Sequence, residues 1–210
     1  MSFDVHVEVT APIATVRLVQ AAPREAALDL AGWRALGSAF HGLCARRDVA
    51  CVAVLGVGGG PAADRGGALE TMDGALLAIQ RCTHPTVAIV EGLCSGPGLE
   101  VAASCDLRVC SESSRFGRPI ERLGGRATSL ADWPAPLVRL LGASSVLATL
   151  RAGELIGAPD ARRAGLVNRV LPDATVVERG YGLVARIAAG APLVNRWHKR
   201  SMRRLLASDG

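Results

Sequence analysis

The chain has 210 residues, half of them apolar and only 3% aromatic. This length is enough for one domain with a sizeable core, which must be built mainly from aliphatic side chains. The net charge is +5, and basic residues gather late in the chain, at Arg196, Lys199, Arg200, Arg203 and Arg204. A basic tail can contact nucleic acid, a membrane or an anionic ligand, but it is more typical of a solvated helix face. We do not expect nucleic acid as a partner.

The cysteines and the apolar runs exclude several classes of protein. No Cys-x-x-Cys or histidine-rich spacing is present, which argues against a zinc site. The first residues lack the basic and apolar regions of a secretory signal, and no apolar run approaches the ~20 residues that span a membrane. We therefore expect a cytoplasmic protein with free, buried thiols and no membrane segment. The six thiols are Cys44, Cys51, Cys82, Cys94, Cys105 and Cys110.

The first third of the chain alternates between strand and helix patterns. Val5, Val7 and Val9 alternate with polar residues and predict a strand, and residues 13–19 are predicted to form its hairpin partner after a turn at 11–12. A segment with helical spacing follows Pro23 and reaches about Arg47. Residues 49–55 are almost all apolar, which is typical of a strand covered on both faces. Helical spacing returns at 68–82.

Residues 84–125 form the stretch around which we expect the chain to be organised. An apolar strand at 86–90 is followed by a glycine-rich turn at 92–98, a helical segment at 99–104 and a second strand at 107–110. A strand, a tight turn and a helix start present backbone N–H groups to a ligand oxygen. This segment is therefore the predicted functional site.

The remaining residues predict mostly helices, with one last strand. The expected helices are 130–141, 144–150, 158–164, 175–189 and 192–207, and the expected strand is 167–171. We find no internal repeat or linker. Alternating strands and helices predict an α/β fold with crossover connections and a mostly parallel sheet.

Two motifs carry a resemblance to a known family. The stretch HPTVAIVEGLCSGPGLEVAASCDLRVCSESSRFGRP at 84–119 resembles the signature of the crotonase superfamily, the enoyl-CoA hydratase/isomerase group. GELIGAPDARRAGLVNRVLPD at 153–173 resembles a later run of the same family. The resemblance implies repeated ββα units with closing C-terminal helices. It places the core and active site at 1–142, and at 143–210 a helical trimerisation region of the same domain.

The resemblance also implies an activity. Family members hold the carbonyl oxygen of an acyl thioester between two backbone N–H groups, an oxyanion hole. We expect a CoA or carrier-protein thioester substrate, a hydratase, dehydratase or double-bond isomerase reaction, and a homotrimer or hexamer. No cofactor is expected beyond the CoA thioester itself. The segment between the strand expected at 49–55 and His84 is shorter than in most family members. In this the chain resembles the compact crotonase-like enzymes of secondary metabolism.

The family pattern maps onto particular residues of this chain. Glu100 matches the first catalytic carboxylate, whereas Ile120 stands at the second, so that Glu121 or Asp132 would have to replace it. The first oxyanion donor would lie near Asp64 or Arg65. The second falls in the triplet Gly96, Pro97 and Gly98, where the middle residue has no N–H. The resemblance therefore implies a donor shifted to Gly98 or Gly96, or a hole with one donor fewer.

Simpler interpretations of these residues remain open. Glu100 can be a helix-capping charge, Glu121 a surface charge, Asp132 the residue before a helix that Pro134 begins, and Pro97 an ordinary helix start. Cys94 is interpreted as a small apolar filler, His84 as a loop residue and His198 as structural. Two functional alternatives are a catalytically weak homologue that acts as an accessory subunit, and an acyl-thioester decarboxylase.

Overall fold

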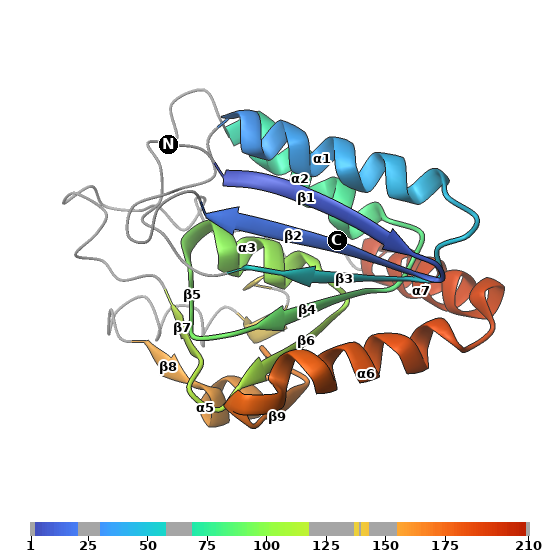
Figure 1. The fold of residues 1–210 in the computed structure, drawn as a ribbon. Coiled ribbons are helices and arrows are strands. Elements are labelled where there is room, and N and C mark those ends of the chain that lie inside the picture. Colours follow the sequence, from blue (N-terminus) through green and yellow to red (C-terminus); the bar gives the residue numbers. More distant parts are fainter. Residues whose placement is uncertain are drawn as a thin grey trace.

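A computed structural model describes residues 3–20, 30–57, 69–117, 137–138, 140–142 and 155–208. Strands and helices alternate along the chain, and the closing segment is helical (Figure 1). The strands are β1 (Phe3–Thr10), β2 (Ile13–Gln20), β3 (Cys51–Leu55), β4 (Thr86–Val90), β5 (Leu93–Ser95), β6 (Leu107–Ser111), β7 (Arg115–Gly117), β8 (Ile156–Gly157) and β9 (Arg169–Leu171). The helices are α1 (Leu30–Ala45), α2 (Leu69–Arg81), α3 (Gly96–Ser104), α5 (Ala158–Arg163), α6 (Val176–Ala188) and α7 (Pro192–Ser208), with a 3₁₀ turn at Asp173–Thr175.

A six-stranded sheet in the order β1-β2-β3-β4-β6-β9 forms the centre of the fold. The β1–β2 hairpin is antiparallel, as predicted, and Thr10 pairs with Ile13 across its turn. From β2 onward every neighbouring pair is parallel. Parallel neighbours require crossover connections, and α1 and α2 supply them between β2, β3 and β4. The predicted α/β class with a mostly parallel sheet is confirmed.

Helices cover both faces of this sheet. One cluster of buried residues joins Val52, Val54, Ala88 and Val90 to α1, α2 and α3. The intervening residues of the same strands, such as Ala53 and Ile89, belong to a second cluster with α6. Successive side chains of a strand point to opposite faces. This is why β3 and β4 are apolar at almost every position, and the fold has three layers (Figure 1).

A second, smaller sheet is not predicted by the sequence. It contains the three short strands β5, β7 and β8. Residues 93–95 fall within the predicted glycine-rich turn, but they form β5, which pairs in parallel with β7. Strands of two or three residues are too short to show an alternating pattern. Their pairing depends on contacts between segments distant in the sequence.

Most other predicted elements are confirmed, with ends shifted by a few residues. The strand predicted at 167–171 begins at Arg169, and the helix at 175–189 corresponds to the 3₁₀ turn and α6. Of the helix predicted at 130–141, residues 137–138 and 140–142 are helical, and the remainder lies outside the described residues, as does the helix predicted at 144–150. The division into 1–142 and 143–210 stays a prediction.

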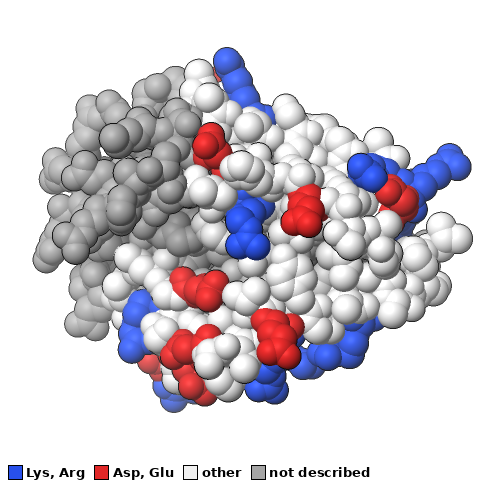
Figure 2. Space-filling model, viewed as in Figure 1, with Lys and Arg blue, Asp and Glu red and all other residues white. Residues whose placement is uncertain are grey.

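Charged side chains are mixed on the face of the molecule in Figure 2. Acidic and basic groups of described residues alternate across it rather than gathering by sign. A continuous stripe of one sign is the usual footprint of a nucleic-acid-binding surface. The visible face does not have that pattern among the residues described.

Candidate active site

The candidate site is built where β4 leads into α3. Gly92 follows the strand with φ +66°, and Gly96 begins the helix with φ +52°. Residues other than glycine rarely adopt this left-handed backbone conformation, so glycine suits both positions. Between them the three residues of β5 redirect the chain into α3. The predicted order of strand, glycine-rich connection and helix is confirmed.

Glu100 lies on α3, and its carboxyl is almost completely buried, with 2% of the residue exposed. Its neighbours Leu99 and Val101 are buried as well. A solvated capping charge would be exposed, so the burial argues against that simpler interpretation. The first turn of α3 holds no acidic residue, so Glu100 lies beyond the turn in which the helix dipole acts most strongly. Glu100 is therefore a carboxylate enclosed by protein near the middle of a nine-residue helix.

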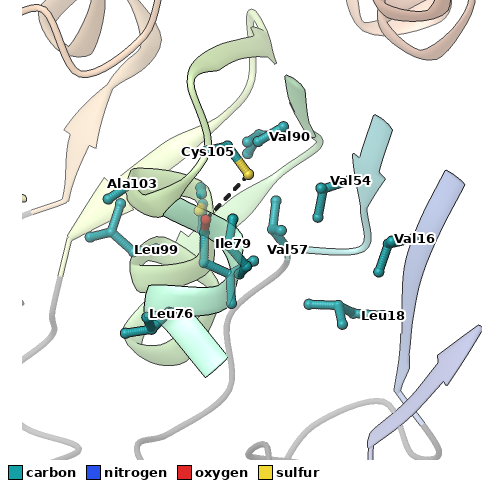
Figure 3. Packing of buried hydrophobic residues seen from close by; sticks show 14 of the residues in the cluster. Val16, Leu18, Val54, Val57, Leu76, Ile79, Val90, Leu99, Ala103 and Cys105 are labelled. Atoms are coloured by element: carbon teal, nitrogen blue, oxygen red, sulfur yellow. Dashed lines mark hydrogen bonds between the residues drawn. The ribbon is translucent and has the colours of Figure 1, made fainter. Parts of the chain in front are cut away.

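The packing of α3 explains why Glu100 is enclosed. Leu99 and Ala103 belong to the same buried cluster as Leu76 and Ile79 of α2 (Figure 3). After the helix, the Cys105 thiol donates to the carbonyl oxygen of Val101 at 3.4 Å, the dashed line in Figure 3. All residues of this short helix except Pro97 are therefore buried. Its small residues, predicted from the sequence to be helical, allow that close packing.

Pro97 occupies the first turn of α3, directly after Gly96. The first N–H groups of a helix have no acceptor within the helix and can bind an oxygen, but proline has no N–H. Gly98 is the next residue, is buried, and is one position closer to Glu100. The structure thus brings together four predicted residues, Gly96, Pro97, Gly98 and Glu100, on one segment.

The other predicted site residues lie outside the described residues. This holds for Asp64 and Arg65, which follow β3 in the sequence, and for Glu121 and Asp132, which follow β7. Ile120 lies in the same undescribed segment. Their roles stay predictions.

Arg108 holds the C-terminal end of α3, a role that the sequence pattern does not reveal. Its residue is 3% exposed, and its guanidinium donates to the carbonyl oxygens of Cys105 at 2.6 Å, Ala102 at 3.2 Å and Leu166 at 2.6 Å. A cation near the last carbonyls of a helix is favoured by the helix dipole. Burial lowers the pKa of Arg108 from its usual value. The one clue in the sequence is a lone arginine in an apolar strand.

A polar network occupies the amino end of β4, opposite the candidate site. Asp106 accepts hydrogen bonds from the Thr86 N–H at 2.7 Å and hydroxyl at 2.9 Å. Its carboxylate also pairs with Lys199 of α7 at 2.5 Å. Lys199 in turn donates to the His84 carbonyl oxygen at 2.8 Å. These residues tie α7 to the sheet.

His84 lies in the same network and is fully buried, so its interpretation as a loop residue is incomplete. Arg196 contacts its Nδ1 at 3.3 Å, and because arginine only donates, Nδ1 is the acceptor. Its Nε2 then carries the proton and donates to the Leu43 carbonyl oxygen at 3.0 Å. Burial and the positive charge of Arg196 lower the pKa of His84. The histidine is neutral in this arrangement.

The basic tail is only partly a solvated face, which corrects the simplest interpretation of it. Arg196 and Arg203 donate to the carbonyl oxygens of Val49 at 3.2 Å and Cys82 at 2.8 Å, whereas Arg200 and Arg204 are exposed. His198 is exposed and its ring lies 5.3 Å from that of Trp197.

The described residues allow three further observations. Cys94 is fully buried, and burial raises the pKa of its thiol, which fits a small apolar filler. Among the residues that the structure describes, no three His, Cys, Asp or Glu side chains group as metal ligands would. None of the described helices combines the length and apolar character needed to cross a membrane.

Comparisons with known proteins match this architecture. Residues 56–209 match the family model for enoyl-CoA hydratase/isomerase. A short-chain-enoyl-CoA hydratase of Clostridium acetobutylicum is 31% identical over 125 residues, 60% of this chain and 47% of that protein. A mitochondrial Δ(3,5)-Δ(2,4)-dienoyl-CoA isomerase of Dictyostelium discoideum is 32% identical over 119 residues, 55% of this chain and 39% of that protein.

Solved structures extend the similarity to nearly the whole fold. The crystal structure of an enoyl-CoA hydratase/carnitine racemase from Magnetospirillum magneticum is 32% identical, with a TM-score of 0.84. The match covers 96% of this chain and 80% of that one. The chain therefore belongs to the enoyl-CoA hydratase/isomerase family, the crotonase superfamily. It spans about half or less of the length of the curated relatives that it matches.

Proposed function

We propose that the chain binds an acyl thioester of CoA or a carrier protein and hydrates, dehydrates or isomerises a double bond in its acyl group. The observation that carries the proposal is the buried carboxyl of Glu100 on α3, two residues after the buried Gly98 in the first turn of the same helix. The hydratase and the isomerase among the relatives support this range of reactions. The short segment between β3 and His84 favours a substrate such as one of secondary metabolism.

In the proposed mechanism, Glu100 moves a proton at the carbon beside the thioester carbonyl. Negative charge then develops on the carbonyl oxygen, and fixed N–H donors stabilise it by a few kcal/mol. Gly98 supplies one donor in place of Pro97, and the backbone at Asp64 or Arg65 supplies the other. Hydration needs a second carboxylate, from Glu121 or Asp132, to activate the water, whereas isomerisation can proceed with Glu100 alone. Addition or loss of water and migration of a double bond need no external electron donor or acceptor, so we propose no cofactor. We also propose that the enzyme is cytoplasmic.

The experiment that tests Glu100 uses crotonyl-CoA and a panel of longer enoyl-CoA thioesters. Glu100→Gln preserves the side-chain shape but removes proton transfer, and we expect kcat to fall roughly 10²–10⁴-fold. Glu91→Gln is the matched control, because Glu91 lies on the same segment but is exposed. Equal turnover by Glu100→Gln and the wild-type protein would eliminate Glu100 as the acid/base.

Pro97 has a matched control in this chain. Pro159 also stands in the first turn of a helix, α5, where it follows Ala158. Pro97→Gly adds an N–H at the candidate hole, and we expect kcat/KM to rise if the hole has one donor fewer and to stay unchanged if Gly98 has replaced Pro97. Pro159→Gly should leave kcat/KM unchanged in either case. A large loss in Pro97→Gly alone, with a folded protein, would contradict both forms of the hole.

Pro97 also favours one alternative, a weakly catalytic homologue that acts as an accessory subunit. If the protein is such an accessory subunit, it binds CoA thioesters without turning them over, or binds none. Isothermal titration with crotonyl-CoA and CoA distinguishes these outcomes. A decarboxylase would need the hole and a carboxylate-binding pocket, and a malonyl-type thioester in the same panel tests it.

We infer that the protein assembles as a homotrimer or as a dimer of trimers through its closing helices. On α7, Leu193, Trp197 and Leu205 are 78%, 64% and 66% exposed, an apolar surface that a second copy would cover. Light scattering at micromolar concentration is expected to give a trimer or hexamer. Trp197→Glu should shift the protein toward monomers, whereas a monomeric wild-type protein would contradict the assembly.

A further inference from the structure

Two cysteines from different helices meet at the amino-terminal side of the sheet. Cys44 lies in the last turn of α1, and Cys82 directly follows α2. The two side chains lie close enough to interact, and the hydroxyl of Thr83, the residue after Cys82, donates to the Cys44 carbonyl oxygen at 3.5 Å. Both thiols are free in this structure. The candidate active site uses neither of them.

The contacts around the pair fix the two helix ends against each other. The His84 ring donates to the carbonyl oxygen of Leu43, and the Thr83 hydroxyl donates to that of Cys44 at 3.5 Å. Farther along, α1 and α2 approach closely at Gly37, where a methyl group in place of the hydrogen would lie 3.5 Å from the Cα of Ala75. The proximity of the two thiols therefore follows from helix packing and does not depend on a single loop.

The two thiols differ in exposure and in electrostatic environment. Cys44 is half-buried, whereas Cys82 is fully buried. The neighbouring Cys82 thiol lowers the pKa of Cys44, and the Thr83 backbone, Lys199 and His41 lower it further. The neighbouring Cys44 thiol and burial raise the pKa of Cys82. Of the two thiols, Cys44 is therefore the more exposed and the one whose pKa is lowered.

The remaining cysteines have the opposite character. Cys51, Cys94, Cys105 and Cys110 are all buried, and burial raises the pKa of each. A thiol is reactive as the thiolate, and an exposed thiolate beside a second thiol is the arrangement of a redox-sensitive pair. Among the cysteines, all of which lie in the described part of the chain, only Cys44 combines partial exposure with a lowered pKa.

We propose that Cys44 and Cys82 form a thiol pair that a hydroperoxide oxidises reversibly to a disulfide between α1 and the end of α2. The Cys44 thiolate attacks one peroxide oxygen and becomes a sulfenic acid, while the O–O bond breaks and the leaving oxygen takes up a proton as water. The Cys82 sulfur then attacks the Cys44 sulfur, expelling hydroxide, which leaves as water with the Cys82 proton. Two thiols and one hydrogen peroxide thus give one disulfide and two waters.

The test treats the reduced full-length protein with one equivalent of hydrogen peroxide, blocks free thiols and maps peptides without reduction. The expected product is a single Cys44–Cys82 disulfide that dithiothreitol reverses. Cys110→Ser is the control and should give the same product, whereas Cys44→Ser should give no disulfide. In Cys82→Ser, oxidation should stop at a Cys44 sulfenic acid that dimedone traps. A disulfide with any other cysteine, or an unreacted Cys44, would overturn the proposal.

A second measurement separates reactivity from simple proximity. At pH 7 iodoacetamide should alkylate Cys44 about tenfold faster in the folded protein than in the urea-unfolded protein, because more of it is thiolate. Lys199→Gln should move the pH midpoint of this reaction upward, since it removes a nearby positive charge. Equal rates in folded and unfolded protein would overturn the assigned role of Cys44.

Discussion

The two ends of β4 place buried polar groups in different settings. At the amino end, His84, Asp106 and Lys199 are joined by short hydrogen bonds to one another or to backbone carbonyls. At the carboxyl end, the buried carboxyl of Glu100 lies on a helix whose first turn presents N–H groups. Ligands of open parallel sheets bind at the carboxyl ends of the strands. The comparison teaches that burial of a polar group alone does not identify a site, because the partners of that group decide its role.

The largest effect on stability is expected from Arg108, which donates hydrogen bonds to backbone carbonyls at the C-terminal end of α3. Arg108→Met keeps the apolar part of the side chain but removes the donors to Cys105, Ala102 and Leu166. We expect unfolding in urea to show a loss of about 3–4 kcal/mol, because buried carbonyls lose charged donors. Arg169→Met, at an exposed position of β9, is the control and should change little. If the two variants are equally stable, Arg108 does not hold α3.

Asp106 tests the network at the amino end. Asp106→Ala leaves the Lys199 ammonium, whose side chain is 7% exposed, without its carboxylate. We expect a loss of about 2–3 kcal/mol in urea unfolding, reduced from the value for fully buried pairs because Asp106 is 33% exposed. Asp48→Ala breaks a pair with Arg46 at the same 2.5 Å distance but on the surface, and should cost much less. Equal losses would mean that burial of the pair is unimportant.

The middle of β4 provides a smaller and sharper test. A side-chain carbon at Gly180 of α6 would lie 2.8 Å from Cδ1 of Ile89, closer than such atoms approach, whereas one at Gly182 would meet only the end of Arg186 at 3.9 Å. Gly182→Ala should gain up to ~1 kcal/mol from helix propensity. Gly180→Ala has the same gain but must displace α6, and we expect a net loss of about 1 kcal/mol in thermal unfolding. A stabilised Gly180→Ala would show that α6 can move away from β4.

The smallest expected effect is a pH dependence of stability from His84. Its pKa is lowered in the folded protein by burial and by Arg196, so the unfolded chain binds the proton more readily. The stabilisation by neutral His84 is therefore complete above the ordinary histidine pKa of about 6.5 and is lost as the pH falls below it. Urea midpoints between pH 8 and pH 5 should fall more for the wild-type protein than for His84→Gln. Parallel curves would contradict a buried neutral histidine.

The contrast between the ends of β4 also marks what the sequence can predict. Thr86–Val90 and the helix after it follow from an apolar run and glycine spacing, which are local patterns. The network at the amino end joins residues such as Lys199 and His84, far apart in the chain, and no local pattern reveals such a contact. Glu100 is predicted by the family motif, and its burial by its apolar neighbours. The strands β5, β7 and β8 escape prediction because they are too short to have a period.

The outer strands of the large sheet limit how copies of this protein can associate. In the described part of the chain these strands are β1 and β9. The β1 strand carries Asp4, His6 and Glu8 at exposed positions, and β9 has only three residues and begins with the exposed Arg169. Charged side chains and short length discourage the addition of another strand to a sheet edge. Continuous sheets through neighbouring copies are therefore disfavoured, which favours helix surfaces as the contacts of the proposed assembly.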